Sequence, residues 1–465
     1  MVTVWTHPKR DSLDTSVPVV VITWGDYGHG HCIARSLGRL GIPVYIVHTN
    51  PHSPETRSRY WRENFIWDIK KASPDESVDW LLQLARKLGM RPVLIPTGDI
   101  CCLFVEDNAA ALKEGFLFPN QPAGLARSLS SKKQMYFLCK KYSIPTAETV
   151  FPQSREDVIE FLRNATFPVM LKCIDYTVLR SINTRKKVIL GDAEAVLKHY
   201  DKMKGLEDIT NFMLQEYIPG GSEMLWMFNG YFDEESRCLF GLTGKRFRQY
   251  PAYTGMTSLG ICVVDDAVAR QTRDFMKAIG YQGILDIGHM YDTRTGQYKL
   301  LDANPRIGAA YRLFVDTCGL DVAQVLYRDL TGQPVLPGGP QVGRKWVVEN
   351  FDVVSSLTLY HDGKLGVREW ARSFRGVEEA CWFSWDDPTT FFMMVWFSLK
   401  LVFEWWVRRE RRTGHTRRPP RRAQTGGSRR VRSWRRSPTA RACRTRRRRR
   451  GRRGPTPRRR ECGAR

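Results

Sequence analysis

The stretch "LLDANPRIG" at residues 300–308 places three polar side chains on alternate residues, namely Asp302, Asn304 and Arg306. Alternate side chains of an extended strand share one face, so these three should project together. A carboxylate, an amide and a guanidinium on one face of a strand end predict a site that holds a charged ligand.

A second carboxylate should lie beside this motif. "GILDIGHMYD" and "GQYKLLDANP" have the pattern of two strands joined through "TRTG". A turn centred near Arg294 sets Asp286 opposite a residue between 302 and 304, unless a bulge shifts the register. Carboxylate and amide oxygens are hard ligands that suit Mg²⁺, which accepts one or two carboxylates together with substrate phosphates. The hairpin therefore predicts a metal site made of Asp286, Asp302 and Asn304.

Phosphates would also need cations that are not metal. Lys132 opens a helix after a Ser cap, where backbone amides favour anions, and Lys172 ends the apolar strand "PVML", a costly place for an ammonium without a charged partner. Each lysine alone is best explained as a surface charge. Together, with a carboxylate hairpin downstream, they indicate phosphate binding.

The elements that must position these residues follow from the hydrophobic pattern. An apolar run at 17–24, a Gly-rich turn with a helix, and further strand and helix patterns predict a small parallel α/β domain over 18–125. The turn reads G-x-x-G-x-G, so the dinucleotide-binding spacing G-x-G-x-x-G is not present there. Strand and helix patterns continue through 126–337. The segment 338–385 reads as mainly strands, and Asp386-Asp387-Pro388 signals the start of an apolar helix over 386–409.

The charge of +25 over 465 residues is confined to the C-terminus. Residues 408–465 carry 26 Arg, no Lys and 2 acids, whereas residues 1–407 carry 47 basic and 46 acidic residues. The tail at 410–465 is too charged and too poor in apolar residues to fold. One interpretation is an electrostatic arm that binds an acidic membrane or, less in keeping with the neutral core, nucleic acid. The other is a segment without a selected role, since arginine without lysine suits GC-rich codon usage or a shifted reading frame.

The cellular setting is inferred from the cysteines and the apolar helix. Eleven cysteines without a C-x-x-C pair favour a reducing cytoplasm. The run from Phe391 to Val407 is short for a bilayer span and is interrupted by Lys400 and Glu404. We expect this helix to pack on the core, or else to lie in the inner membrane surface with Trp405 and Trp406 at the headgroups and the arginines on anionic lipid.

These marks, taken in order, resemble the ATP-grasp superfamily, and most of all its carboxylate–amine ligases of the D-aspartate-ligase type. The resemblance covers roughly 18–337 and rests on Lys132 before "SIP", Lys172 in "PVMLKC", "LQEYIPGGSE", and "GILDIGHMYD" followed by "LLDANPR". It implies an α/β fold in which the N-terminal parallel domain precedes an ATP-grasp domain of two subdomains at 126–337. The chain departs from the family at Asp302, where Glu is commoner, and in the loop after Lys172, which lacks glycine.

The resemblance also implies roles for single residues. The lysines Lys132 and Lys172 would bind the α- and β-phosphates of ATP. The backbone of Glu216 and Ile218 would bind adenine, and Glu223 the ribose. Asp286, Asp302 and Asn304 would bind Mg²⁺ or Mn²⁺ at the phosphates. Arg306 would hold the γ-phosphate and the acyl phosphate formed from it. Arg248 would grip phosphate or a substrate carboxylate, unless it is an exposed strand charge.

The implied activity is that of a ligase that uses ATP and Mg²⁺. It would convert a small carboxylate of amino-acid type into an acyl phosphate for attack by an amine, with release of ADP and phosphate. Two alternatives stay open. One is another acyl-phosphate reaction, such as carboxylation of the biotin-carboxylase type, and the other is a nucleotide-binding protein without catalysis.

Overall fold

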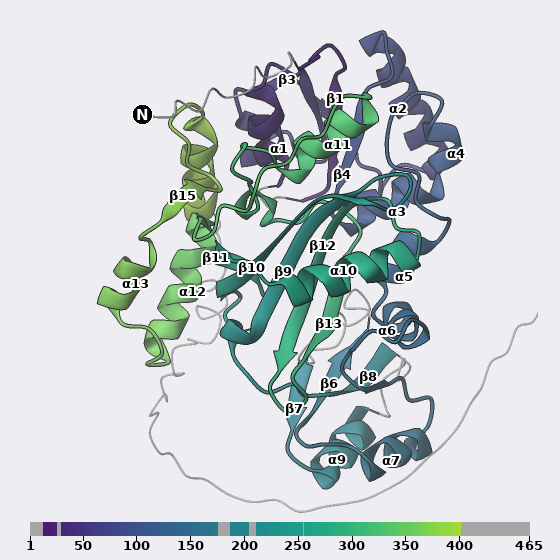
Figure 1. The fold of residues 1–465 in the computed structure, drawn as a ribbon, viewed down its shortest axis with the longest axis vertical. Coiled ribbons are helices and arrows are strands. Elements are labelled where there is room, and N and C mark those ends of the chain that lie inside the picture. Colours follow the sequence, from purple (N-terminus) through teal and green to yellow (C-terminus); the bar gives the residue numbers. More distant parts are fainter. Residues whose placement is uncertain (1–12, 26–28, 175–186, 204–210, 254, 401–465) are drawn as a thin grey trace, which may run out of the picture. The chain divides into compact units, whose positions relative to one another are not determined.

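The computed structural model describes residues 13–25, 29–174, 187–203, 211–253 and 255–400, and within them the chain forms three sheets (Figure 1). The N-terminal sheet is parallel, in the order β3-β2-β1-β4. Its strands and helices are β1 (Val19–Thr23), α1 (His29–Gly38), β2 (Val44–His48), β3 (Trp61–Ile66), α2 (Pro74–Leu88), β4 (Val93–Thr97), α3 (Asp99–Asp107) and α4 (Ala109–Leu112). Every residue of β1 is buried, as a parallel strand covered on both faces requires. The predicted parallel α/β domain is confirmed.

The large sheet has the order β13-β12-β9-β10-β11-β14-β15, and only β14 and β15 pair in parallel. Its strands are β9 (Leu225–Phe232), β10 (Cys238–Tyr250), β11 (Met256–Cys262), β12 (Gly283–Asp292), β13 (Gln297–Asn304), β14 (Lys345–Val347) and β15 (Val377–Ala380). Helix α10 (Asp266–Ala278) covers one face through a cluster that includes Phe228, Phe275 and Ile287. The other face is packed against the N-terminal domain.

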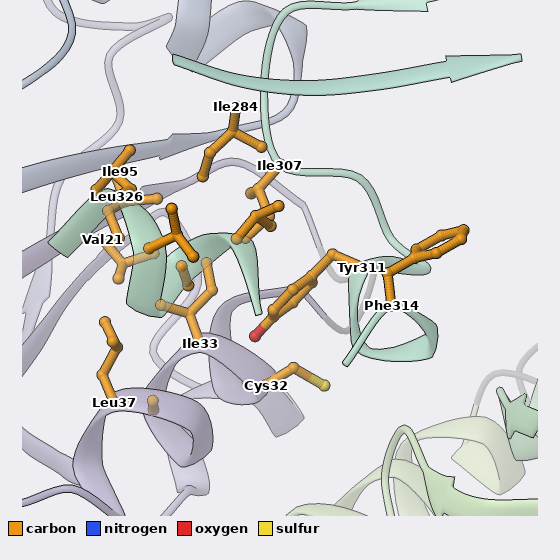
Figure 2. Packing of buried hydrophobic residues seen from close by; sticks show 14 of the residues in the cluster. Val21, Cys32, Ile33, Leu37, Ile95, Ile284, Ile307, Tyr311, Phe314 and Leu326 are labelled. Atoms are coloured by element: carbon orange, nitrogen blue, oxygen red, sulfur yellow. The ribbon is translucent and has the colours of Figure 1, made fainter. Parts of the chain in front are cut away.

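The core between these two sheets is continuous. Figure 2 shows side chains of the N-terminal sheet and α1, such as Val21 and Ile33, beside Ile284 and Ile307 of the large-sheet region. Leu326 of helix α11 (Val322–Leu330) joins the same cluster. Successive residues of β9 and β12 enter opposite clusters, because successive strand side chains point to opposite faces.

The small sheet has the order β5-β8-β6-β7 and is antiparallel. Its elements are α5 (Leu125–Ser130), α6 (Lys132–Lys141), β5 (Thr149–Val150), α7 (Arg155–Arg163), β6 (Val169–Cys173), β7 (Lys187–Leu190), α9 (Ala193–Met203) and β8 (Phe212–Glu216), where α5 and α6 lead into the sheet. Its core includes Val158, Leu171, Val196 and Leu214, so α7 and α9 pack on the sheet. A small and a large antiparallel sheet after a parallel domain is the predicted two-subdomain arrangement.

The prediction of a strand-rich segment at 338–385 is wrong. Besides β14 and β15 the segment holds two helices, α12 (Glu349–His361) and α13 (Val367–Ser373). Helix α12 buries polar residues, Asp352, Ser355 and Ser356, against β10, so its sequence lacks the apolar stripe that identifies a surface helix. Its β-branched and aromatic residues suggested strands, and tertiary contacts overrode that propensity.

The predicted apolar helix is confirmed where the structure describes it, at 389–400. Met394 is buried in the central core and Phe391 packs against it, as expected for a helix that lies on the core. Phe392, Trp396 and Leu399 are nevertheless exposed on another side. No helix in the described ranges is long and apolar enough to cross a membrane. The arginine-rich tail lies outside the described residues, and contact with a membrane surface stays a prediction.

A buried histidine in β12 should make stability depend on pH. His289 is fully buried, and the described residues provide neither ring nitrogen with a hydrogen bond. Burial lowers its pKa from 6.5 to about 4, against the opposing effect of the carboxylates Asp302 and Asp265. The unfolded chain therefore takes up this proton first, and the stability contributed by neutral His289 is complete above pH 6.5 and lost as the pH falls towards 4.

We expect His289 to lower the free energy of unfolding by about 2 kcal/mol between pH 7.5 and pH 5. His289→Phe should remove that part of the pH dependence in urea unfolding, whereas His361→Phe, at an exposed position, should keep it. Equal pH slopes for His289→Phe and the unaltered chain would contradict the burial argument.

Candidate active site

The register of the β12–β13 hairpin brings the predicted metal ligands together. Asp286 pairs with Asn304 and Gly288 pairs with Asp302, which confirms the expected juxtaposition. The next pair is His289 with Leu300, so a bulge skips Leu301. Because of the bulge, Leu300 stays in the core on the α10 side while Leu301 turns to the opposite side.

Two glycines provide the space for these carboxylates. A Cβ atom on Gly308 would lie 2.3 Å from Asp286 Oδ2, and one on Gly288 would lie 2.4 Å from Asp302 Oδ1. Such separations are far below van der Waals contact, so neither position accepts a side chain unless a carboxylate moves. We call Asp286, Asp302 and Asn304 the oxygen cluster.

The electrostatics of the oxygen cluster favour a cation. The pKa of Asp286 is raised from 3.8 to about 6, mainly by burial and also by the Asp302 carboxylate, while Arg306 and Arg246 oppose the shift. Two carboxylates and an amide oxygen at one strand end form a donor set of the kind that Mg²⁺ accepts. The residues therefore fit the implied metal, and the lack of a side chain at Gly288 and Gly308 leaves room for the two carboxylates.

Arg306 links the cluster to the N-terminal domain. Its Nε donates to Asp99 Oδ1 at 2.8 Å, and its Nη2 lies 3.4 Å from Asn304 Oδ1. Asp99 is the first residue of α3, directly after the turn that follows β4. The exposure pattern agrees with the expected placement of Arg306 on the same face as Asp302 and Asn304. These three residues are at least partly exposed, whereas Ala303 and Pro305 between them are buried.

A cavity of about 980 Å³ lies between the small and the large sheet. Met170 and Ile189 of the small sheet line one wall, and Met290 and Leu301 of the large sheet line another. Two apolar walls fit a flat aromatic ring. The predicted residues that line this cavity are Lys172, Glu216, Ile218, Glu223 and Arg248.

The predicted nucleotide-binding residues have defined partners. Lys172 Nζ donates to Gln215 Oε1 at 2.6 Å, and Glu223 Oε1 accepts from the Gly221 amide at 2.9 Å. Lys132 does not line the cavity, but its Nζ donates to the Ile174 carbonyl at 3.2 Å, just beyond the strand end that carries Lys172. The structure therefore brings both lysines to one end of β6.

Glu216 and Ile218 lie where the chain leaves β8. The carboxylate of Glu216 accepts from Arg294 and from Lys299, at 2.6 and 2.8 Å, and its amide donates to the Glu148 carbonyl at 2.8 Å. These contacts fix the strand end. Ile218 is buried and packs with Ala147 and Met290 on the apolar side of the cavity.

Arg248 was expected either to grip phosphate or a substrate carboxylate or to be an exposed strand charge, and the structure shows a third environment. It is neither exposed nor directed at a ligand, because its Nε and Nη2 form a buried two-point ion pair with Asp352 at 2.7 and 2.9 Å. Its Nη1 donates to Ser373 Oγ at 2.8 Å, which ties α12 and α13 to β10. A paired guanidinium of this kind supports the cavity wall.

Arg246 is the cation that the sequence reasoning passed over. It lines the cavity, and its Nε has no hydrogen bond among the described residues. A Cβ atom on Gly288 would lie 3.7 Å from Arg246 Nη2 and 2.4 Å from Asp302 Oδ1, so the guanidinium is near the Asp302 carboxylate. Register shifts on both sides of the pair at Arg248 interrupt the β10–β11 ladder. The sequence "GKRFRQYP" could not distinguish Arg246 from Arg248. In a regular strand, residues two apart share one face, and a bulge cannot be read from the sequence.

The chain was compared with known proteins. A scan against models of protein families gives no match. The chain is 24% identical over 264 residues to a D-aspartate ligase of Enterococcus faecium, a match that covers 54% of this chain and 62% of that enzyme. The match therefore spans less than two thirds of that relative's length.

Two solved structures share the fold. The biotin carboxylase domain of a 2-oxoglutarate carboxylase from Hydrogenobacter thermophilus, solved with MgADP and bicarbonate, aligns with a TM-score of 0.51 at 15% identity, over 70% of this chain and 73% of that one. An L-amino acid ligase from Bacillus licheniformis aligns with a TM-score of 0.50 at 13% identity, over 69% of this chain and 77% of that one.

The role of Asp286 as a metal ligand can be tested by placing a methyl group beside its carboxylate. Gly308→Ala should displace the Asp286 carboxylate, because the new methyl group would lie 2.3 Å from its Oδ2. We expect binding of Mn²⁺, followed by its paramagnetic signal, to weaken by about tenfold or more.

Gly339→Ala is the matched control, since a Cβ there meets nothing within 4 Å. Unchanged Mn²⁺ affinity in the Gly308→Ala protein, with the fold intact by circular dichroism, would show that Asp286 does not bind the cation.

Proposed function

We propose, on the premise that the chain belongs to the ATP-grasp superfamily, that it is a ligase that uses ATP and Mg²⁺ to activate a carboxylate as an acyl phosphate for attack by an amine. The observation that carries this proposal is the oxygen cluster at the end of the β12–β13 hairpin, next to a cavity with apolar walls and a lysine. The names of two similar proteins, a D-aspartate ligase and an L-amino acid ligase, support substrates of the amino-acid type.

In this proposal ATP lies between the two sheets. Adenine would fit against Met290 and Leu301, close to the Ile218 backbone, and Glu223 would accept from the ribose hydroxyls. Lys172, with Lys132 at the same end of β6, would neutralise the α- and β-phosphates. Phosphoryl transfer needs mainly position and charge neutralisation, which such groups supply.

Asp286, Asp302 and Asn304 would hold Mg²⁺, which supplies charge neutralisation at the phosphates when bound. Arg306 and Arg246 flank the oxygen cluster, and we assign to them the transferred phosphoryl group. The substrate carboxylate attacks the γ-phosphorus, ADP leaves, and the amine then displaces phosphate from the acyl carbon. We assign Arg248 to support of α12 and α13, because its polar atoms are already paired.

The alternatives predict different requirements. Carboxylation of the biotin-carboxylase type would need bicarbonate, and the fold is shared with such a domain. A nucleotide-binding protein without catalysis would bind ATP and release no ADP. Both remain testable in one assay, because only the ligase requires an amino acid together with an amine.

We expect the purified full chain, given ATP, Mg²⁺ and a panel of amines, to release ADP only when certain amino acids are also present. Asp302→Ala and Asn304→Ala should lower that rate by about 100-fold or more. Each removes an oxygen ligand of the metal ion, and that ion would neutralise the charge of the transition state. Asp274→Ala, at an exposed position on α10, is the control and should leave the rate unchanged.

ADP release that needs bicarbonate and no amino acid would favour carboxylation instead. Retention of most of the turnover dependent on Mg²⁺ in both variants would remove the oxygen cluster from the mechanism. ATP binding by calorimetry without ADP release under any condition would support the non-catalytic alternative.

A further inference from the structure

A group of sulfur and nitrogen atoms lies away from the oxygen cluster, between the N-terminal domain and the segment after β15. His31 and Cys32 come from α1, and Cys381 directly follows β15. All three side chains are buried, at 0%, 2% and 1% exposure. We call them the sulfur cluster. Within the described ranges, this is the one group of at least three His, Cys, Asp or Glu side chains whose ligand atoms all lie within 4.8 Å of one another.

The separations within the sulfur cluster match those around a metal ion. Cys32 Sγ lies 3.9 Å from Cys381 Sγ and 3.8 Å from His31 Nε2. Around a tetrahedral Zn²⁺, with Zn–S near 2.3 Å and Zn–N near 2.0 Å, ligand atoms stand about 3.8 Å apart for two sulfurs and about 3.6 Å apart for sulfur and nitrogen. The two sulfurs therefore already stand at about the separation that Zn²⁺ requires, and a ring nitrogen of His31 lies within 4.8 Å of both.

We propose that His31, Cys32 and Cys381 bind a zinc-type cation that fastens the segment after β15 to α1. Two thiolates and one imidazole are ligands that Zn²⁺ prefers, and two thiolate charges would balance its charge in a buried place. These three side chains would leave one position of a tetrahedral ion for a further ligand. The proposal does not depend on the ligase activity.

The surroundings hold the ligands in place before a metal arrives. Arg35, also on α1, donates to the carbonyls of Cys381 and Trp382 at 2.8 and 2.6 Å and pairs with Asp387 at 2.8 Å. The His31 ring stacks on Trp382 with centroids 4.5 Å apart. A metal site with ligands fixed by neighbouring contacts loses little conformational entropy on binding.

An unsatisfied atom also points to a missing partner. His31 Nε2 lies 2.7 Å from the Cys381 carbonyl, whereas its Nδ1 has no hydrogen bond among the described residues although the ring is fully buried. A buried polar atom without a partner is unusual and calls for an explanation such as a bound ion. Coordination through Nδ1 would provide one, and Nε2 would keep donating to the Cys381 carbonyl.

The test uses Co²⁺ as a spectroscopic probe on the full chain, purified under reducing conditions and stripped with a chelator. We expect one equivalent of Co²⁺ to produce a thiolate-to-cobalt charge-transfer band, Zn²⁺ to displace it, and Zn²⁺ to raise the melting temperature. Cys32→Ala and Cys381→Ala should each abolish the band. Cys101→Ala removes an equally buried thiol outside the cluster and should keep the band, as should Asp302→Ala.

The spectrum of the unaltered chain decides the proposal even if a variant fails to fold. A folded chain that shows neither the charge-transfer band nor a shift in melting temperature would overturn it. So would a disulfide-linked peptide pair that contains Cys32 and Cys381 after mild peroxide treatment, together with no metal binding under reducing conditions.

Discussion

The pairing of β12 with β13 is the constraint on which the candidate active site depends. A slip of one residue would send the whole set of side chains on a strand to the opposite face, so Asp302 and Asn304 would enter the core beside α10. The observed register instead sets Asp286 opposite Asn304, and the bulge turns Leu301 towards the cavity while Leu300 remains in the core. One hairpin thereby supplies both the metal ligands and part of the apolar wall.

The buried carboxylates of this hairpin depend on positive charges from other parts of the chain. Burial keeps the pKa of Asp286 high, and the guanidinium groups of Arg306 and Arg246 oppose that effect. Arg306 is in turn oriented by Asp99 at the start of α3, so the N-terminal domain contributes to the geometry of the hairpin. The continuous core between the two sheets maintains that relation, as Figure 2 shows for Ile95, Ile284 and Ile307.

Short-range patterns accounted for most of the fold and for the oxygen cluster. Three local patterns predict secondary structure from neighbouring residues alone. They are the apolar run of β1, the Ser cap before α6 and the alternation in "LLDANPRIG". The two-subdomain arrangement came from a resemblance rather than from such patterns, and the shared fold supports it.

What escaped prediction depends on tertiary contacts. The partner of Arg248 is Asp352, 104 residues away, so no local pattern could assign the arginine to a buried pair. The same contact explains why α12 was read as a strand, since its buried face is polar. Arg246 was passed over because both arginines line the cavity, and only the tertiary partners of Arg248, which the sequence does not reveal, distinguish it from Arg246. The sulfur cluster joins residues 349 positions apart and has no motif spacing.

The account rests on formation of an acyl phosphate, and transfer of an oxygen isotope tests that step most directly. The amino acid that supports ADP release is supplied with ¹⁸O in its carboxylate, and the released phosphate is analysed by mass spectrometry. Because the carboxylate oxygen attacks the γ-phosphorus and leaves with phosphate when the amine attacks, the account predicts one ¹⁸O in phosphate per turnover. Unlabelled phosphate beside labelled product would contradict it.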